Sequence, residues 1–253
     1  MRVFLGFDDT DTIDADRGTG KLARWFEQEL PDEVRVWGVM RQQLLVHDLV
    51  PYTSHNSSAC VVMDAPEEYP VSDLVDRAVR HLENHFLEGS DPGICMAREN
   101  EPGLPDLIAF GNRCTHRVVT QKEALAATSA PGVHLSGHGG TNDGIIGAAA
   151  AIGLTASGWS GRFIEFGCLR DFSDTVTVGE LERQNIKVVS LEKNADSPLP
   201  EDTVLTYDWV RPRLLGDQAV LLVQQKSQGV WENIGAKARK DKKAAAAAAA
   251  AKG

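Results

Sequence analysis

The chain has 253 residues, of which 42% are hydrophobic and 25% are charged. This length and composition suit one large or two small globular units and exclude disorder as the default. No apolar run reaches the roughly 18 residues that a membrane span needs, and the start MRVFLGFDD lacks the basic lead and long apolar stretch of a signal peptide. We therefore expect a cytoplasmic protein that contacts no membrane.

The charge is unevenly distributed. The net charge is −10, and because residues 236–253 carry +5, the rest of the chain carries −15. A body this acidic repels a nucleic-acid backbone unless a local basic patch compensates, which favours a small substrate or a protein partner. The segment 237–253, with its run of alanines, is interpreted as a tag or an untraced stretch and is left out of the functional argument.

The first part of the chain alternates strand and helix patterns. Strands are expected at 2–7, 33–40, 58–63 and 94–97, and helices at 18–30 and 71–86. The helix at 71–86 rests on an apolar stripe with i, i+3, i+4 spacing. The order β-α-β-β-α-β is that of the ferredoxin-like fold, so we expect an α+β protein with a ferredoxin-like N-terminal half.

The rest of the chain predicts a mixed α/β segment and then a β-rich region. Thr120 and Glu123 fit a capping box ahead of a short helix, and small residues predict a closely packed helix at 145–154. Short apolar runs predict strands at 133–135, 162–166, 186–191, 203–210 and 219–225, the last three forming an antiparallel end. The expected domains are 1–98, 99–172 and 173–236, followed by the tail at 237–253.

The first candidate site follows the first predicted strand, where Asp8, Asp9 and Asp11 lie within four residues. Carboxylates this close repel one another unless a cation neutralises them, and Mg²⁺ takes carboxylate oxygens while it bridges to phosphates. An acidic turn that caps the next helix is the structural alternative. Asp9-Thr10-Asp11 also resembles the nucleophile motif of haloacid-dehalogenase-type phosphatases, which the apolar Ile13 disfavours.

The second candidate site is the glycine-rich segment from 136 to 147, which precedes a predicted helix. Glycines let backbone N–H groups approach a phosphate, and a helix N-terminus favours an anion. The expected nucleotide contacts are Gly137, Gly139, Gly140, Asn142 and Gly144. A glycine-rich loop can also be only a turn.

Two further segments offer polar groups at the predicted ends of elements. Thr19, at the start of the first helix, could cap that helix, ligate a metal or accept a phosphoryl group. His55 and Asn56 lie in a polar loop between two strands and are candidate substrate contacts, although such loops are often only loops.

Several segments, taken in order, resemble one family. GFDDTDT resembles the opening motif of the archaeal tRNA-isoleucine agmatinylcytidine synthetases, and RGTGKLA, VPYTSHNSSACV, DPGIC and TNDGIIGAAAAIG resemble later segments of that family. The resemblance covers residues 1–168. It implies a kinase-like part that uses ATP, with Asp8, Asp9 and Asp11 handling metal and phosphate and Thr19 as a phosphate acceptor.

The chain differs from this family in the parts that would bind tRNA. The segment at 53–58 lacks two cations of the family motif. We expect neither the family's nucleic-acid-binding β-barrel nor its zinc ribbon, because the chain is too short for both and its four cysteines form no Cys-x-x-Cys pair for a ribbon. We expect an ATP- and Mg²⁺-dependent phosphoryl- or nucleotidyl-transfer enzyme acting on a small molecule or nucleoside. A non-catalytic nucleotide- or metabolite-binding regulator, a tRNA-modifying enzyme with a separate tRNA-binding subunit, and a homo-oligomeric state stay open.

Overall fold

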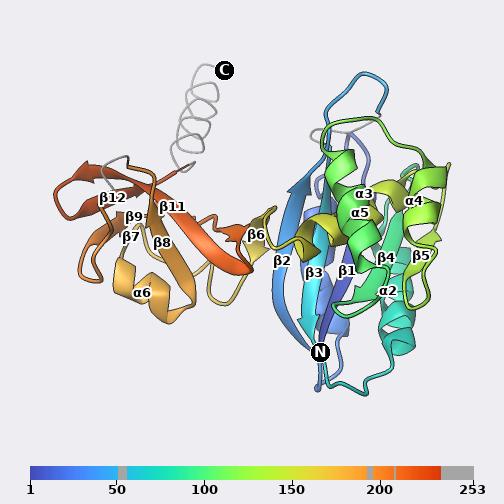
Figure 1. Cartoon of the computed structure of the whole chain (residues 1–253), viewed down its shortest axis with the longest axis horizontal. Coiled ribbons are helices and arrows are strands. Elements are labelled where there is room, and N and C mark those ends of the chain that lie inside the picture. The colour runs from blue at the N-terminus through green and yellow to red at the C-terminus, as the bar shows by residue number, and fades with distance from the viewer. Residues whose placement is uncertain (51–55, 193–195, 208, 235–253) are drawn as a thin grey trace. The chain divides into compact units, whose positions relative to one another are not determined.

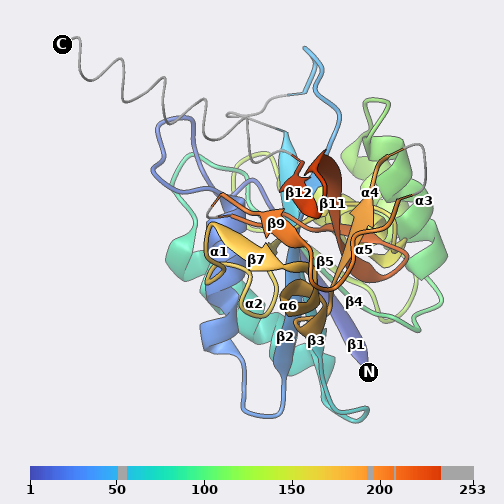
Figure 2. The ribbon, with the colours of Figure 1, turned by 90° about the vertical axis from the view of Figure 1, so that its left-hand side faces the viewer.

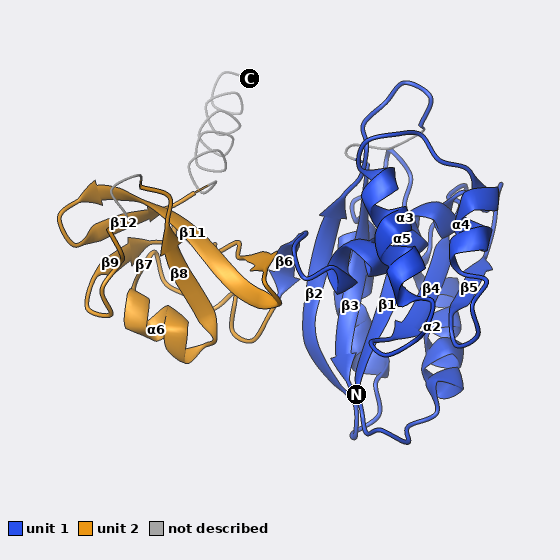
Figure 3. Cartoon of the chain, in the orientation of Figure 1, with its two compact units in different colours: residues 1–165 blue, residues 166–253 orange. Residues whose placement is uncertain are grey.

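The structure, a computed structural model, describes residues 1–50, 56–192, 196–207 and 209–234. The chain forms two compact units, Met1–Glu165 and Phe166–Gly253 (Figure 3). Both units combine helices with mostly antiparallel strands, which confirms the predicted mixture of α and β structure. No helix in these ranges is long and apolar enough to cross a membrane.

The first unit is built on a sheet that contains every strand predicted before residue 166. Its strands are β1 (Arg2–Asp8), β2 (Arg35–Gln43), β3 (Ser57–Asp64), β4 (Gly93–Arg98), β5 (His134–Gly137) and β6 (Arg162–Glu165). They are arranged in the order β5-β4-β1-β3-β2-β6, and every neighbouring pair is antiparallel (Figure 1).

Helices cover both faces of this sheet. They are α1 (Thr19–Trp25), the 3-10 helix η1 (Phe26–Glu29), α2 (Val71–His85), α3 (Leu104–Cys114), α4 (Gln121–Ala127) and α5 (Gly144–Ala156). Helices α1 and α2 lie on one side of strands β1 to β4, and α3, α4 and α5 lie on the other (Figure 2). The element order through β4 is the predicted one, whereas α3 was not predicted.

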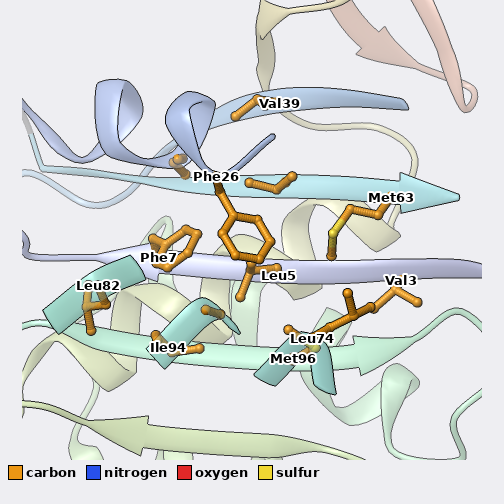
Figure 4. Packing of buried hydrophobic residues seen from close by; sticks show 14 of the residues in the cluster. Val3, Leu5, Phe7, Phe26, Val39, Met63, Leu74, Leu82, Ile94 and Met96 are labelled. Atoms are coloured by element: carbon orange, nitrogen blue, oxygen red, sulfur yellow. The ribbon is translucent and has the colours of Figure 1, made fainter. Parts of the chain in front are cut away.

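The main core lies between the sheet and the pair α1 and α2. Val3, Leu5 and Phe7 alternate along β1 and are fully buried there, as the period of two in a strand requires (Figure 4). The Phe7 and Phe26 rings meet edge to face with centroids 5.9 Å apart, which joins the strand to the end of α1. The residues of β1 that alternate with Val3, Leu5 and Phe7 therefore point toward α5, and so does Asp8 at the end of the strand.

Helix α5 approaches the sheet closely because glycines face it. A Cβ atom at Gly6 of β1 would collide with the backbone of Ala148, and one at Gly93 of β4 would collide with the backbone between Gly144 and Ile145. The helix therefore rests directly on β1 and β4. This contact fixes the start of α5 beside the end of β1.

The second unit is β-rich, as predicted, but its strand pairing is mixed. Its elements are β7 (Thr175–Thr177), α6 (Val178–Arg183), β8 (Ile186–Ser190), β9 (Thr203–Leu205), β10 (Arg213–Leu215), β11 (Gln218–Ser227) and β12 (Val230–Asn233). Strand β8 is parallel to β11 and β9 is parallel to β12, so the expected all-antiparallel arrangement is wrong for these pairs. Each parallel pair joins two strands that do not follow one another in the chain, so local sequence patterns could not indicate the direction of the pairing.

Candidate functional site

One edge of the first sheet gathers the predicted functional segments. Asp8, the last residue of β1, is paired with Gly93, the first residue of β4, and Gly93 is paired with Gly137 at the end of β5. Helix α5 begins seven residues after Gly137, at Gly144. The acidic segment and the glycine-rich turn, far apart in sequence, therefore meet at this edge.

The Asp8 carboxylate lies against the first turn of α5. A Cβ atom on Gly147 would overlap the carboxylate of Asp8, so only glycine fits there without a shift. Removal from water, followed by repulsion from Asp9, raises the pKa of Asp8 to about 8. A bound cation would reverse both effects and favour the ionised form.

Asp9 has a left-handed backbone, with φ 51°, a conformation that Asp tolerates better than most residues. Burial, followed by the neighbouring carboxylates of Asp91 and Asp11 and a smaller effect of Asp143, raises the pKa of Asp9 to about 6. Four carboxylates from three separate segments therefore share one electrostatic environment. Such an arrangement is costly unless positive charge enters it.

Asp11 serves a different purpose from Asp8 and Asp9. Its Oδ1 accepts hydrogen bonds from the Thr19 amide at 3.3 Å and from the Thr19 hydroxyl at 3.2 Å. Gly18, the residue before α1, has no side chain to cap the helix, so Asp11 caps it from outside. Thr19 is buried, and its hydroxyl also accepts a hydrogen bond from the Thr10 hydroxyl at 3.1 Å.

The carboxylates do not converge as a complete set of metal ligands. Among the described residues, no three acidic, histidine or cysteine side chains form a group that could hold a metal ion by themselves. Mg²⁺ needs less, because it usually takes one or two carboxylates and completes its coordination with water and substrate phosphates. Asp8 and Asp9 fit that requirement; the Oδ1 of Asp11 accepts both hydrogen bonds from Thr19, and metal binding by Asp11 stays a prediction.

The glycine-rich turn is held in place by Asp91. The Asp91 carboxylate accepts hydrogen bonds from the amide of Thr141, at 3.0 Å, and from its hydroxyl, and the Asp91 carbonyl accepts one from the Gly144 amide at 3.0 Å. Gly140 has a positive φ of 54° and lies so close to this carboxylate that a Cβ atom would collide with it. The conformation of the turn thus depends on Asp91.

Hydrogen bonds within the protein use most of the turn's backbone amides. His138, Asn142 and Ile145 donate to the carbonyls of Pro92, Gly139 and Asn142 at 2.8, 3.1 and 3.2 Å. In the part of the chain that the structure describes, the amides of Gly139, Gly140 and Asp143 have no acceptor. Of the predicted nucleotide contacts, Gly139 and Gly140 thus have amides left for a phosphate, while the amides of Asn142 and Gly144 stabilise the turn.

Of the two predicted substrate contacts, the structure describes Asn56, which lies directly before β3. Asn56 holds the β2–β3 connection together: its side chain donates to the Leu45 carbonyl at 2.6 Å, and its carbonyl accepts from the Leu44 amide at 2.9 Å. It precedes β3 at the sheet edge that carries Asp8. His55 lies outside the described residues. Direct contact of Asn56 with a substrate stays a prediction.

Sequence reasoning missed Asp91 and Asp143. Asp143 precedes α5, and its carboxylate accepts a hydrogen bond from the Gln121 side chain at 2.6 Å. The sequence contained a signal for both, because Asp91 lies three residues before the strand predicted at 94–97 and Asp143 lies within the glycine-rich segment. In an antiparallel pair the start of one strand lies beside the end of the other, so an acid just before β4 could have been expected near the acids at the end of β1.

The first unit is thus an α+β sandwich whose sheet edge combines clustered carboxylates with a glycine-rich turn. No protein-family model matches the chain, and no curated protein matches it. Solved structures similar to it include a tRNA fluorescent labeling enzyme and TiaS, a tRNA agmatidine synthetase, in complex with its tRNA and ATP; each of these two has 26% sequence identity and a TM-score of 0.52.

A TiaS complex with tRNA, AMPCPP and agmatine is similar at 26% identity and a TM-score of 0.50. All three matches cover 60% of this chain and 36% of the other chain. The protein therefore shares a fold with about a third of the length of these enzymes, and their activities do not transfer to it by likeness alone.

Proposed function

We propose that the protein is an ATP-dependent phosphoryl- or nucleotidyl-transfer enzyme. The observation that carries this proposal is the meeting of Asp8 and Asp9, both with raised pKa values, with a turn whose Gly139 and Gly140 amides have no acceptor in the described chain. The similar TiaS structures contain ATP and AMPCPP, which supports ATP as the nucleotide of this protein. In this proposal the part through β4, with strand order β4-β1-β3-β2, is a ferredoxin-like unit.

The chain's own residues have separate tasks in this proposal. Asp8 and Asp9 would hold Mg²⁺, which would reduce the charge penalty on the phosphates. The amides of Gly139 and Gly140 would donate to a phosphate oxygen. Asp11 accepts the hydrogen bond of the Thr19 hydroxyl, so it is placed to take that proton if Thr19 receives a phosphoryl group from ATP and ADP leaves.

The acceptor that we propose is a nucleoside, and the similar tRNA-bound enzymes support tRNA as its source. A free small molecule is the other candidate. The two candidates can be distinguished by salt dependence. Because most of the chain is acidic, tRNA binding would require local contacts to phosphates, and salt weakens such contacts. Filter binding of tRNA across a salt series should show a steep loss of affinity with salt if tRNA is the substrate, and no measurable binding if it is not.

The central test is the substitution Asp9→Ala. It should abolish Mg²⁺-dependent ATP turnover while the circular dichroism spectrum stays unchanged, since Asp9 follows β1 and contributes no side chain to the core. Asp14→Ala is the matched control, because Asp14 is an exposed acid in the same segment. Equal turnover by purified Asp9→Ala and wild-type protein would defeat the proposal.

A non-catalytic nucleotide-binding regulator is the second candidate, supported by the burial of the Thr19 hydroxyl. Both candidates bind ATP, but only the enzyme transfers its phosphate. Mass spectrometry after incubation with ATP and Mg²⁺ separates them. Phosphate on Thr19 in the wild-type protein, and its loss in Asp11→Asn, would favour the enzyme; ATP binding with neither phosphate transfer nor turnover would favour the regulator.

A further inference from the structure

A second polar cluster lies on the other face of the first sheet. His134 and Ser136 of β5 are paired with two residues of β4 that belong to the core under α1 and α2. Side chains directly opposite each other on neighbouring strands share a face, so His134 and Ser136 point toward α2. Asp8 lies against α5 on the opposite face, so this cluster is separate from the candidate site.

The imidazoles of His134 and His138 meet at one serine oxygen. The Oγ of Ser136 lies 2.9 Å from the Nε2 of His134 and 2.7 Å from the Nε2 of His138. The two nitrogens are therefore no further apart than these two distances together. Burial lowers the pKa of both histidines below the usual 6.5, so each ring is neutral at pH 7 and keeps a lone pair on one nitrogen.

Acids of α2 stand behind these rings and favour one protonation state. The Oε1 of Glu83 lies 4.0 Å from the Nδ1 of His138, and the charge of Asp76 acts on His134. A proton on the Nδ1 of His138 faces the Glu83 carboxylate, and the Nε2 of His138 then accepts the hydroxyl proton of Ser136. Since Ser136 has only one proton, the Nε2 of His134 must donate its own proton to the same oxygen.

The proton of His134 is not held in that position by a second contact. In the described part of the chain the Nδ1 of His134 forms no hydrogen bond, so moving the ring proton from Nε2 to Nδ1 breaks only the hydrogen bond to Ser136. The Nε2 atoms of His134 and His138 then both direct a lone pair toward the position that the Ser136 oxygen occupies. A cation placed between them would satisfy both nitrogens at once.

Two converging imidazole nitrogens are suitable ligands for a borderline divalent metal ion. Imidazole suits Zn²⁺, Cu²⁺ and Ni²⁺, whereas Mg²⁺ takes oxygen ligands. A carboxylate behind the ring is the usual outer partner of a metal-bound histidine, and Glu83 has that position behind His138. Two imidazoles are one ligand fewer than a catalytic zinc site has, so water must complete the coordination. His134, Ser136 and His138 are all partly exposed, so water reaches them.

We propose that His134 and His138 bind a Zn²⁺ ion through their Nε2 atoms, with the Ser136 hydroxyl beside the ion and water as the remaining ligands. This site does not depend on the proposed function. His138 directly precedes Gly139, and its amide donates to the Pro92 carbonyl at 2.8 Å, so the ion would also fix the start of the glycine-rich turn.

The test is isothermal titration of the full chain, metal-free and without a histidine tag, with Zn²⁺. His134→Gln and His138→Gln should each weaken binding at least ~10-fold, because even the loss of an outer partner weakens metal sites by about 10–100-fold. His116→Gln is the matched control, since His116 is exposed and lies outside the cluster, and it should change nothing. Asp8→Ala removes the other site that attracts cations, and Zn²⁺ binding at the histidines should persist in it.

Two readouts separate a metal site from a cluster that only supports the fold. Cu²⁺ bound to the wild-type protein should show the couplings of two imidazole nitrogens in electron paramagnetic resonance, and of one in either histidine variant. Zn²⁺ should raise the melting temperature of the wild type, because an ion that binds only the folded chain stabilises it, but not that of the double variant. A purely structural cluster would show neither response.

The outcomes distinguish this inference from the proposed function. Absent Zn²⁺ binding, equal binding by the wild type and the double histidine variant, or complete loss of binding in Asp8→Ala overturns the inference. Zn²⁺ binding through the two histidines in a protein that never turns over ATP upholds it and contradicts only the proposed function.

Discussion

The contact between Gly147 and Asp8 can be tested by adding one methyl group. In Gly147→Ala the new Cβ falls on the Asp8 carboxylate. Neither side can yield easily, because β1 is paired with β4 and α5 is pressed on the sheet at Gly6 and Gly93. Overpacking of this kind costs about 1–3 kcal/mol, and the better helix propensity of alanine offsets about 1 kcal/mol of that cost. We expect a net loss of up to about 2 kcal/mol and a weaker affinity for Mg²⁺.

Urea unfolding and Mg²⁺ titration of the purified variants measure both effects. Gly139→Ala is the control, because a Cβ there makes an ordinary contact of 3.5 Å with Pro92. The decisive comparison is Gly147→Ala in an Asp8→Ala background, where the overlap with the carboxylate is gone and only a close contact of 3.0 Å with the Cβ of residue 8 remains. The alanine should cost clearly less there than in the wild-type background. An equal cost of Gly147→Ala with and without the Asp8 carboxylate would refute the steric argument.

Two other predictions concern His81 and Asp91. His81 is 1% exposed, its Nε2 donates to the Leu22 carbonyl at 2.9 Å, and burial lowers its pKa below 6.5, with His85 and Glu29 as its charged neighbours. Below pH 6.5 the unfolded chain therefore binds a proton at His81 that the folded chain does not bind. The stabilisation from His81 is complete above pH 6.5, and as the pH decreases below 6.5 it is lost by up to about 1.4 kcal/mol per pH unit. Urea unfolding between pH 7 and pH 5.5 should show a steeper loss of stability for the wild type than for His81→Gln. Asp91→Ala removes both side-chain acceptors of the glycine-rich turn and should cost about 1–3 kcal/mol in urea unfolding at pH 7, whereas no change would show that the turn does not depend on Asp91.

Periodicity predicted most elements of the first unit because their burial is one-sided. The apolar stripe expected at 71–86 became α2, which ends one residue earlier, and the apolar run at 2–7 became β1, with Asp8 added. Helix α3 was missed because Pro105 and Gly111 look like helix breakers. Proline is tolerated in the first turn, where its missing N–H has no partner anyway, and Gly111 is needed where α3 meets the backbone of α5.

The candidate site was predictable only where one segment carries the signal. The acids after β1 and the glycines before α5 each stand out in sequence, so both were found. Asp91 becomes part of the site only through the pairing of β4 with β1 and β5. The register between strands that are far apart in the chain cannot be predicted from local composition, so the part of the site that depends on strand pairing was found only in the structure.

Asp8, Asp9 and Asp11 are close in sequence but have different structural positions. Alternation along β1 directs Asp8 toward α5, the left-handed backbone of Asp9 then turns the chain, and Asp11 reaches the amide that Gly18 cannot cap. The sequence groups the three acids as one predicted metal site, and Asp11 has in addition the structural role of capping α1. Loss of Asp11 should therefore act through the start of α1 and the Thr19 hydroxyl, and loss of Asp8 or Asp9 through the cation, so the same motif would fail in two distinguishable ways.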